Sequence, residues 1–264
     1  MEDLERQWGI HVTKTLTGGS GSYVATAVTA SGTEVVLKVA IPDGLEGHPH
    51  FAKELLTLRL GAGRGYVRVL RADETRNAML HERLGRSLTS LARPVEAQID
   101  VIVATLRQAW RRVPKATPLR TGAMQAQYLS ELIMRKWEAL GQPCDRRTIE
   151  RAEQFAATRH DAYDPSTAVL IHGDAHPTNV LEDPSTPGRF KLIDPDGMLS
   201  EPAHDLAIPL RDWTDELLAG DAVEAGVGWC AQLSAKAGVD AKAIWEWAFV
   251  ERVSTGLFLT RAGG

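Results

Sequence analysis

The sequence has few cysteines, no long apolar run and no excess of positive charge. Its 264 residues include two cysteines, Cys144 and Cys230, which stand apart from each other and from any Cys-x-x-Cys or His-rich spacing. This scarcity argues against a disulfide framework and against a zinc site. No apolar run approaches the roughly 18 residues of a membrane-spanning helix, and the acidic start, Met-Glu-Asp-Leu-Glu-Arg, lacks the pattern of a secretory signal. We therefore expect a cytoplasmic protein with no membrane partner.

The charge balance excludes one further class of partner. There are 30 Lys and Arg residues against 34 Asp and Glu, a net charge of −4. Residues 194–264 hold 12 acidic and 5 basic side chains, a balance of −7, whereas residues 1–193 sum to +3. Nucleic acid is a poor partner for this sequence, because binding it depends on clustered Lys and Arg. The acidic last part favours a cationic ligand, although a solvated acidic face would account for the charge equally well.

The order of hydrophobic patterns predicts two lobes. Strand-like patterns fill about the first eighty residues, and helical periodicity dominates the remainder. The predicted strands cover residues 11–17, 23–30, 34–40, 66–70 and 76–80, and the predicted helices cover residues 51–60, 94–112, 124–140, 148–163, 222–237 and 243–260. We therefore expect an α+β fold with a small β-rich N-lobe (residues 1–81), a larger, mainly helical C-lobe (residues 82–264) and a cleft between them.

The strongest chemical signal is the segment HGDAHPTN at residues 172–179. A short apolar strand leads into it, and a second short strand delivers Asp194. Within the segment, Asp174 precedes Asn179 by five positions. A loop Asp, a loop Asn and a later strand-end Asp are what phosphoryl transfer from a magnesium nucleotide needs, because the protein must position an acceptor hydroxyl and neutralise negative charge. The spacing predicts a kinase.

Each of the three side chains has an expected role. Asp174 is the predicted general base. Its ordinary pKa, about 3.9, is far below that of an alcohol, so it must orient the hydroxyl and take the proton as the bond to phosphorus forms. Asn179 and Asp194 are the predicted magnesium ligands, because Mg²⁺ takes hard oxygen donors and keeps phosphate and water in its shell.

Three neighbouring residues are harder to assign. We expect His172 to orient the loop, and we assign no role to His176, because a lone histidine is usually part of the packing or the surface. Asp196 lies in Asp-Pro-Asp-Gly, where it is either a ligand of a second metal or a turn former.

Lys38 is the candidate phosphate clamp. It lies in the predicted strand at residues 34–40, and Glu54 on the following helix could pair with it. One charge pair at about 4 Å and an effective dielectric of roughly 20 is worth about 4 kcal/mol before desolvation, enough to hold a flexible lysine against phosphates. A plain strand lysine is the alternative.

Two further segments are candidates for nucleotide contacts. Gly19, Gly21 and Ser22 form part of a Gly-rich turn whose backbone N–H groups could approach phosphate oxygens, although the last glycine of the G-x-G-x-x-G pattern is absent. Glu82 and Leu84 lie in the predicted connection between the lobes. Their backbone donors and acceptors could bind adenine, and a plain linker is the alternative.

An acidic stretch past residue 194 is the candidate acceptor site. Asp212, Asp215 and Glu216 could meet guanidinium or ammonium groups, and Trp213 could offer a cation–π face. A solvated helix with one buried tryptophan is the alternative.

These motifs resemble the aminoglycoside phosphotransferase family, a branch of the protein-kinase-like fold. His-Gly-Asp followed by four residues and Asn stands where protein kinases carry His-Arg-Asp, four residues and Asn. Ile-Asp-Pro-Asp-Gly stands where they carry Asp-Phe-Gly. Residues 192–197 and 201–207 look most like the streptomycin and hydroxyurea kinase branch.

The resemblance implies an ATP- and Mg²⁺-dependent O-phosphotransferase acting on a small molecule. It implies Asp174 as the catalytic residue, Asn179 and Asp194 on magnesium, Lys38 on the phosphates, and Asp205 supporting the catalytic loop. Our first hypothesis for the acceptor is a hydroxyl of an aminoglycoside or aminocyclitol such as streptomycin. The alternatives are a kinase of the same mechanism for an amino sugar or other alcohol, and a nucleotide-binding pseudokinase, which the intact motif residues disfavour. The sequence does not fix the oligomeric state.

Overall fold

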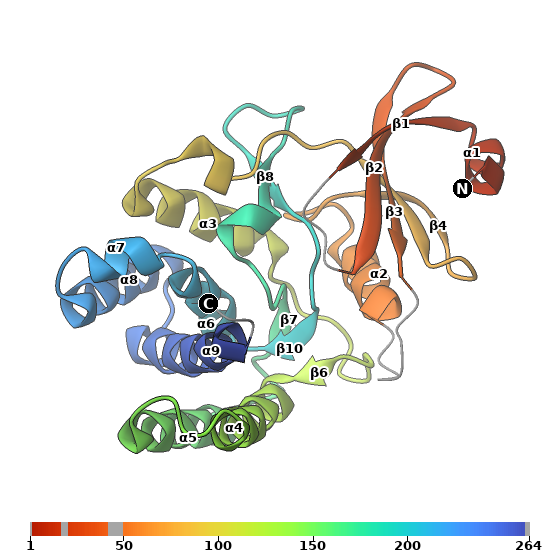
Figure 1. The fold of residues 1–264 in the computed structure, drawn as a ribbon. Helices are drawn as coiled ribbons and strands as arrows, with labels where there is room; N and C mark the ends of the chain where they lie inside the picture. The colour runs from red at the N-terminus through yellow and green to blue at the C-terminus, as the bar shows by residue number, and fades with distance from the viewer. Residues whose placement is uncertain (1, 17–20, 42–49, 262–264) are drawn as a thin grey trace.

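The computed structural model describes residues 2–16, 21–41 and 50–261, and it divides into a β-rich N-lobe and a helical C-lobe (Figure 1). The N-lobe is built on an antiparallel sheet of five strands in the order β1-β2-β3-β5-β4. The strands are β1 Ile10–Leu16, β2 Ser22–Thr29, β3 Glu34–Ala40, β4 Val69–Asp73 and β5 Ala78–Glu82. The expected α+β architecture, with a small β-rich lobe and a larger helical lobe, is present.

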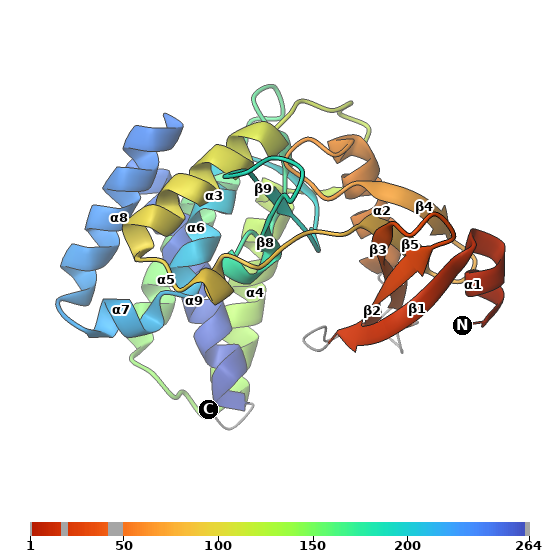
Figure 2. The ribbon, with the colours of Figure 1, turned by 90° about the horizontal axis from the view of Figure 1, so that it is seen from above.

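The two faces of the sheet have different partners, and this places Lys38. Leu37 packs in a cluster with Leu4 and Trp8 of α1 (Glu2–Trp8), at the outer end of the sheet (Figure 2). Because side chains alternate along a strand, Lys38 points to the opposite face, and its register partner Met79 joins the main core. This face is covered by α2 (His50–Gly61), which lies between the sheet and the C-lobe.

The C-lobe packs its helices around one hydrophobic core. The helices are α3 Val95–Ala109, α4 Gly122–Ala139, α5 Arg146–Asp161, α6 Pro202–Ala207, α7 Thr214–Leu218, α8 Ala222–Ala237 and α9 Ala241–Arg261. Side-chain caps fix several of their starts: Thr121 accepts a hydrogen bond from the N–H of Met124, and Asp221 caps α8. No helix of residues 2–16, 21–41 and 50–261 is both long and apolar enough to cross a membrane.

Short strands carry the loops that face the N-lobe. They are β6 Arg120–Thr121, β7 Val169–Ile171, β8 Val180–Glu182, β9 Phe190–Leu192 and β10 Met198–Ser200. β10 pairs with both β6 and β7, and β8 pairs with β9 as a separate antiparallel ribbon. The segment of residues 172–179 therefore follows β7 directly, and Asp194 follows β9, as the sequence predicted.

Backbone pairing joins the two lobes. The carbonyl of Gly65 accepts the N–H of Leu192 at 2.8 Å, and the carbonyl of Leu192 accepts the N–H of Val67 at 2.8 Å. The predicted strand at residues 66–70 is therefore displaced: Tyr66 bridges to Leu192 of the C-lobe, and β4 begins at Val69. This pairing ties the N-lobe to the strand that delivers Asp194.

Most other predicted elements lie within a few residues of their predicted bounds. The helix predicted at residues 94–112 ends earlier, at Ala109, where Trp110 adopts an extended conformation. The sequence patterns missed α1, α6 and α7, which have seven, six and five residues, because such short helices show little periodicity.

Candidate active site

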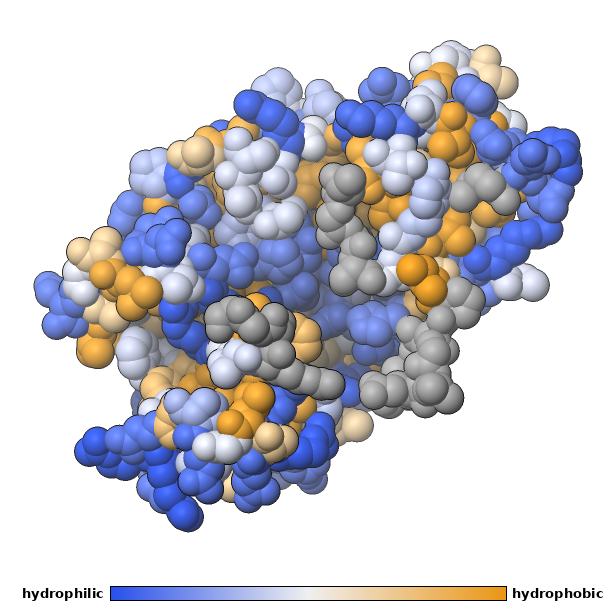
Figure 3. All heavy atoms as spheres, in the orientation of Figure 1, coloured by the Kyte–Doolittle hydropathy of each residue, from blue (hydrophilic) through white to orange (hydrophobic). Residues whose placement is uncertain are grey.

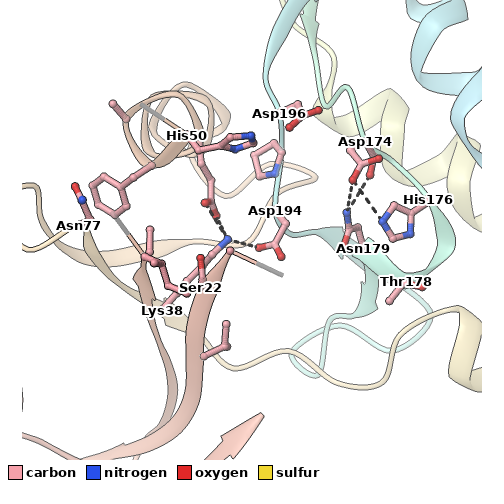
Figure 4. Close-up of a pocket in the computed structure, with 18 residues that line it drawn as sticks. Ser22, Lys38, His50, Asn77, Asp174, His176, Thr178, Asn179, Asp194 and Asp196 are labelled. Carbon is pink, nitrogen blue, oxygen red and sulfur yellow. Dashed lines mark hydrogen bonds and ion pairs between the residues drawn. The ribbon is translucent and has the colours of Figure 1, made fainter. Parts of the chain in front are cut away.

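A cleft of about 440 Å³ lies between the N-lobe sheet, α2 and the two loops of the C-lobe. The space-filling view shows this hollow lined mostly by hydrophilic residues (Figure 3). Polar and charged side chains from both lobes point toward it (Figure 4). They include Ser22, Lys38, Glu54, Asp174, His176, Asn179, Asp194 and Asp196.

Lys38 joins the two lobes through its amino group. Its Nζ lies 2.7 and 2.9 Å from the carboxylate oxygens of Glu54 and 2.8 Å from Oδ1 of Asp194. Both Lys38 and Glu54 are buried. Burial disfavours the charged amine, but the two carboxylates outweigh it and raise the pKa of Lys38 above its ordinary value. The predicted Lys38–Glu54 pair is present, and Lys38 lines the cleft.

Asp205 on α6 supports the backbone of the loop that follows β7. Its Oδ2 accepts hydrogen bonds from the N–H of His172 at 2.9 Å and from the indole of Trp110 at 2.9 Å. Its Oδ1 accepts the N–H of Gly173 at 2.7 Å. A fully buried carboxylate is stable only with such partners. Asp205 therefore fixes the course of the chain just before Asp174.

His172 holds the same loop from inside. Its Nδ1 accepts the N–H of Asp174 at 3.1 Å, so Nε2 carries the proton and donates to the carbonyl of Ile193 at 2.8 Å. The ring thereby links the loop to the residue before Asp194. Gly173 has φ +83°, and a Cβ there would collide with the side chain of Met198. The positive φ favours glycine at this position, whereas the flexible end of Met198 could move.

Asp174 is surrounded by donors. Its Oδ1 lies 2.5 Å from Nη2 of Arg211, and its Oδ2 lies 3.4 Å from Nε2 of His176 and 3.4 Å from Nδ2 of Asn179. Burial alone would raise the pKa of this carboxyl, but the hydrogen bond from His176 and the charge of Arg211 hold it well below its usual range. Asp174 is therefore ionised at neutral pH.

His176 lies between two carboxylates. Its Nε2 faces Asp174, and its Nδ1 lies 3.4 Å from Oδ2 of Asp212. Although burial opposes the charge, these two partners raise the pKa of His176 to about 9. Sequence reasoning assigned this residue no role and did not identify Arg211 as a contact of Asp174. Neither His176 nor Arg211 has a spacing in the sequence that identifies it, because residues 172–179 and 208–213 come together only in the folded protein.

The donors for a metal ion are one carboxylate and one amide. Nδ2 of Asn179 donates to the carbonyl of Asp174 at 3.0 Å, which leaves Oδ1 of Asn179 for another partner. Asp194 uses Oδ1 for Lys38, and no described residue hydrogen-bonds to its Oδ2. No group of three or more His, Cys, Asp or Glu side chains in the described part of the chain could hold a metal. This donor set fits a magnesium ion that arrives with phosphate oxygens and water.

Some of the predicted nucleotide-contact residues line the cleft, and others do not. Gly21 and Ser22 line the cleft, whereas Gly19 lies outside the described residues. Leu84 is buried, and the N–H of Glu82 donates to the carbonyl of Arg68 at 3.1 Å. The Glu82 N–H is therefore committed within the protein, which corrects the expectation that Glu82 offers a donor. Its carbonyl and the backbone of Leu84 remain candidates.

The predicted cation–π face of Trp213 is wrong. The residue is 2% exposed, and its indole N–H donates to Oε1 of Gln98 at 3.1 Å. Its ring packs edge-to-face against Trp229, with the ring centroids 5.3 Å apart. Local sequence could not distinguish this buried orientation from an exposed one.

The acidic residues around Trp213 differ in position. Asp212 faces His176 at the edge of the site, with its side chain 37% exposed. Asp215 and Glu216 are exposed on α7, and neither lines the cleft beside Asp174. Asp212 is therefore the acidic residue of this stretch that the fold brings to Asp174.

The arrangement is that of a protein-kinase-like phosphotransferase. A sheet-borne Lys–Glu pair faces a helical lobe whose loops supply Asp174, Asn179 and Asp194. The choline kinase LicA of Streptococcus pneumoniae has a similar fold, with a TM-score of 0.62 and 16% identity over 100% of this chain and 90% of that chain. An aminoglycoside-3'-phosphotransferase of type VIII has a TM-score of 0.61 and 21% identity, covering 96% of this chain and 98% of that chain.

Sequence comparison identifies the family. The sequence model of the aminoglycoside/hydroxyurea antibiotic resistance kinases matches residues 7–263, and the chain belongs to this family of small-molecule kinases. A hydroxyurea phosphotransferase of Kitasatospora aureofaciens is 33% identical over 235 residues, covering 83% of this chain and 64% of that protein. A streptomycin 6-kinase of Streptomyces glaucescens is 28% identical over 219 residues, covering 83% of this chain and 68% of that protein. The family expected from the motifs is confirmed.

Proposed function

We propose that this chain transfers the γ-phosphate of ATP to a hydroxyl of an aminoglycoside or aminocyclitol such as streptomycin. The observation that carries the proposal is the convergence of Lys38, Asp174, Asn179 and Asp194 on one cleft, in a chain of a small-molecule kinase family. Phosphoryl transfer is catalysed mainly by positioning and charge stabilisation, and these four side chains are suited to both.

The N-lobe residues hold the nucleotide in this proposal. Lys38, kept in place by Glu54, contacts the phosphates, and the backbone around Gly21 and Ser22 approaches their oxygens. The Glu82 carbonyl and the Leu84 backbone are the proposed adenine contacts. Residues 1–81 thus supply the proposed phosphate contacts of the N-lobe, and residues 82–264 supply the adenine contacts at its border, the catalytic loop and the acceptor site.

Asp174 orients the acceptor. Its carboxylate accepts a hydrogen bond from the acceptor hydroxyl, and it takes the proton as the new O–P bond forms and the bond from the γ-phosphorus to the ADP oxygen breaks. A carboxyl with so low a pKa is a weak base, so its main contribution is orientation. A magnesium ion held by Asn179 and Asp194 would neutralise charge on the phosphates.

Acidic groups support a cationic acceptor. Burial and the neighbouring charge of Asp174 raise the pKa of Asp196, although the charges of His50, Lys53 and His172 oppose the shift. An ammonium or guanidinium group nearby would relieve this unfavourable burial. Asp212, partly exposed beside His176, is the second proposed contact.

A second candidate is a kinase of the same mechanism for a small neutral molecule. Arg211 and His176 place two cations against Asp174, which favours an uncharged group around the reacting hydroxyl. A relative of this chain is a hydroxyurea phosphotransferase, and this similarity also favours a small neutral acceptor.

A substrate panel separates these candidates. Purified protein with Mg-ATP is given streptomycin, other aminoglycosides, hydroxyurea, an amino sugar and a simple alcohol, and both ADP release and the mass of the product are measured. We expect a product heavier by one phosphate from at least one aminoglycoside. Turnover on hydroxyurea or a sugar alone would select the second candidate, and ATP binding without turnover on any acceptor would indicate a pseudokinase.

A further inference from the structure

A chain of polar and charged side chains runs from Asp174 into the C-terminal helix. Arg211 uses Nη2 for Oδ1 of Asp174, at 2.5 Å, and Nη1 for Oε2 of Glu251 on α9, at 3.4 Å. The other oxygen of Glu251, Oε1, lies 2.9 Å from Nε2 of His204 on α6. The loop of Asp174 and α9 thus meet at one guanidinium group, and His204 of α6 contacts it indirectly, through Glu251.

Burial makes this chain stiff. His204 is fully buried and stacks on Trp247, with the ring centroids 4.0 Å apart and the planes 13° from parallel. Glu251 is also buried, and removing one partner of a buried ion pair is costly, so its carboxylate stays with His204 and Arg211. Glu251 therefore fixes Nη1 of Arg211, while Nη2 of the same guanidinium contacts Asp174.

The two oxygens of Asp174 differ in their bonding. Oδ1 contacts Arg211, whereas the contacts of Oδ2 within the described part of the chain are with His176 and Asn179, both at 3.4 Å. Oδ1 is paired directly with the guanidinium, whereas contacts of 3.4 Å exceed the usual N–H to oxygen distance of about 2.7–3.2 Å and are weak. Oδ2 is therefore the oxygen that an acceptor hydroxyl can engage, and Arg211 determines which way it points.

We propose that Arg211 and Glu251 are positioning residues for the phosphoryl transfer: Glu251 holds the guanidinium fork of Arg211, and Arg211 fixes Oδ1 of Asp174 so that Oδ2 faces the acceptor hydroxyl. This inference rests on the proposed function. It assigns a role in the reaction to α9, a helix that lines no part of the nucleotide cleft. If these contacts only joined α9 to the loop of Asp174, their loss would lower the stability of the protein and leave kcat unchanged.

The first test is Arg211→Ala with chemical rescue. We expect kcat to fall about 100-fold, because small misplacements of a reacting group cost rates of this order. The KM for ATP should change less than about twofold, since Arg211 is not among the residues that line the cleft. Guanidinium ions at millimolar concentration should restore part of kcat, whereas equal concentrations of sodium chloride should not. Arg211→Lys, which keeps the charge but loses the fork, should retain an intermediate kcat.

The second test is a double-mutant cycle with Glu251→Ala. If Glu251 acts through Arg211, the variant lowers kcat, and the Arg211→Ala/Glu251→Ala double variant is no slower than Arg211→Ala alone. Arg107→Ala is the matched control. It also removes a guanidinium, but from an exposed contact with the carbonyl of Lys236, and it should leave kcat unchanged and unresponsive to guanidinium.

Three results would overturn the inference. The first is an unchanged kcat in folded Arg211→Ala. The second is a lowered kcat that guanidinium does not restore, or that sodium chloride restores equally well, and the third is additive losses in the double variant. If Arg211→Ala does not fold, the Arg211→Lys variant decides, because wild-type kcat in that variant would contradict the need for a fork. A wild-type protein that phosphorylates no acceptor would instead refute the proposed function, and the positioning role with it. An active wild-type protein whose Arg211 and Glu251 variants keep the wild-type kcat would refute the positioning role alone.

Discussion

At the scale of single residues, the charge on His176 is coupled to the two carboxylates that hold it. Its pKa of about 9 in the folded protein lies above the ordinary 6.5. The stabilisation is therefore fully present below about pH 6.5 and is lost as the pH rises through about 9. A shift of this size corresponds to roughly 3 kcal/mol at most, and the side chain is 24% exposed, so we expect less.

The His176→Asn variant tests this coupling. Between pH 6.5 and 9.5, the unfolding free energy of the wild type should fall by about 1–3 kcal/mol more than that of the variant. Denaturant unfolding followed at several pH values measures this difference. Parallel pH profiles would show that His176 is not held charged by Asp174 and Asp212.

The residues found by sequence reasoning and those it missed differ in the range of their contacts. Asp174, Asn179 and Asp194 stand at fixed spacings near short strands, so local patterns identify them. Arg211 contacts Asp174, and Glu251 contacts Arg211, from segments with no such spacing. Only the packing of α9 against the segment that follows α6 brings them together. For the same reason, the exposure of a single ring such as Trp213 could not be predicted.

At the scale of elements, the pairing between Gly65 and β9 holds the lobes together and requires a glycine. Gly65 has φ +72°, and a Cβ there would lie 2.6 Å from the backbone N of Ala109. Gly238, which ends α8, has φ +71° with no atom within 4 Å of the Cβ position. The two glycines have nearly the same positive φ and differ in the space that an added Cβ would find.

We expect Gly238→Ala to cost about 1 kcal/mol from the positive φ alone. Gly65→Ala should cost about 3 kcal/mol, because backbone atoms of α3 must also move. Chemical unfolding of both variants measures the difference. Equal losses would mean that the contact with Ala109 relaxes freely and that this junction is not rigid.

The strands and long helices were predictable at this scale because their periodicity reflects one buried face. The start of β4 was not, because Tyr66 and Val67 pair across the lobes with Leu192 rather than within the N-lobe sheet. A long-range backbone pairing of this kind leaves no local pattern in the sequence.

At the scale of the whole molecule, both lobes line the cleft that we propose as the nucleotide site, so a bound nucleotide should stabilise the folded state. At a concentration of ATP 100 times its Kd, the stabilisation is about 2.7 kcal/mol. The increase in unfolding temperature with Mg-ATP should be much smaller in Lys38→Met, which removes the phosphate contact. Lys14→Met changes an exposed lysine of β1 and should keep the full increase. Equal increases in both variants would remove Lys38 from the nucleotide site.

The account as a whole depends on Asp174 receiving the acceptor proton in a phosphoryl transfer. The most direct measurement is the rate at which wild type and Asp174→Asn form the phosphorylated product from Mg-ATP and the best acceptor of the panel. We predict that the variant loses at least about 100-fold in kcat, while Mg-ATP still raises its unfolding temperature. A variant that forms the product at the wild-type rate would contradict the role of Asp174 and the site built around it.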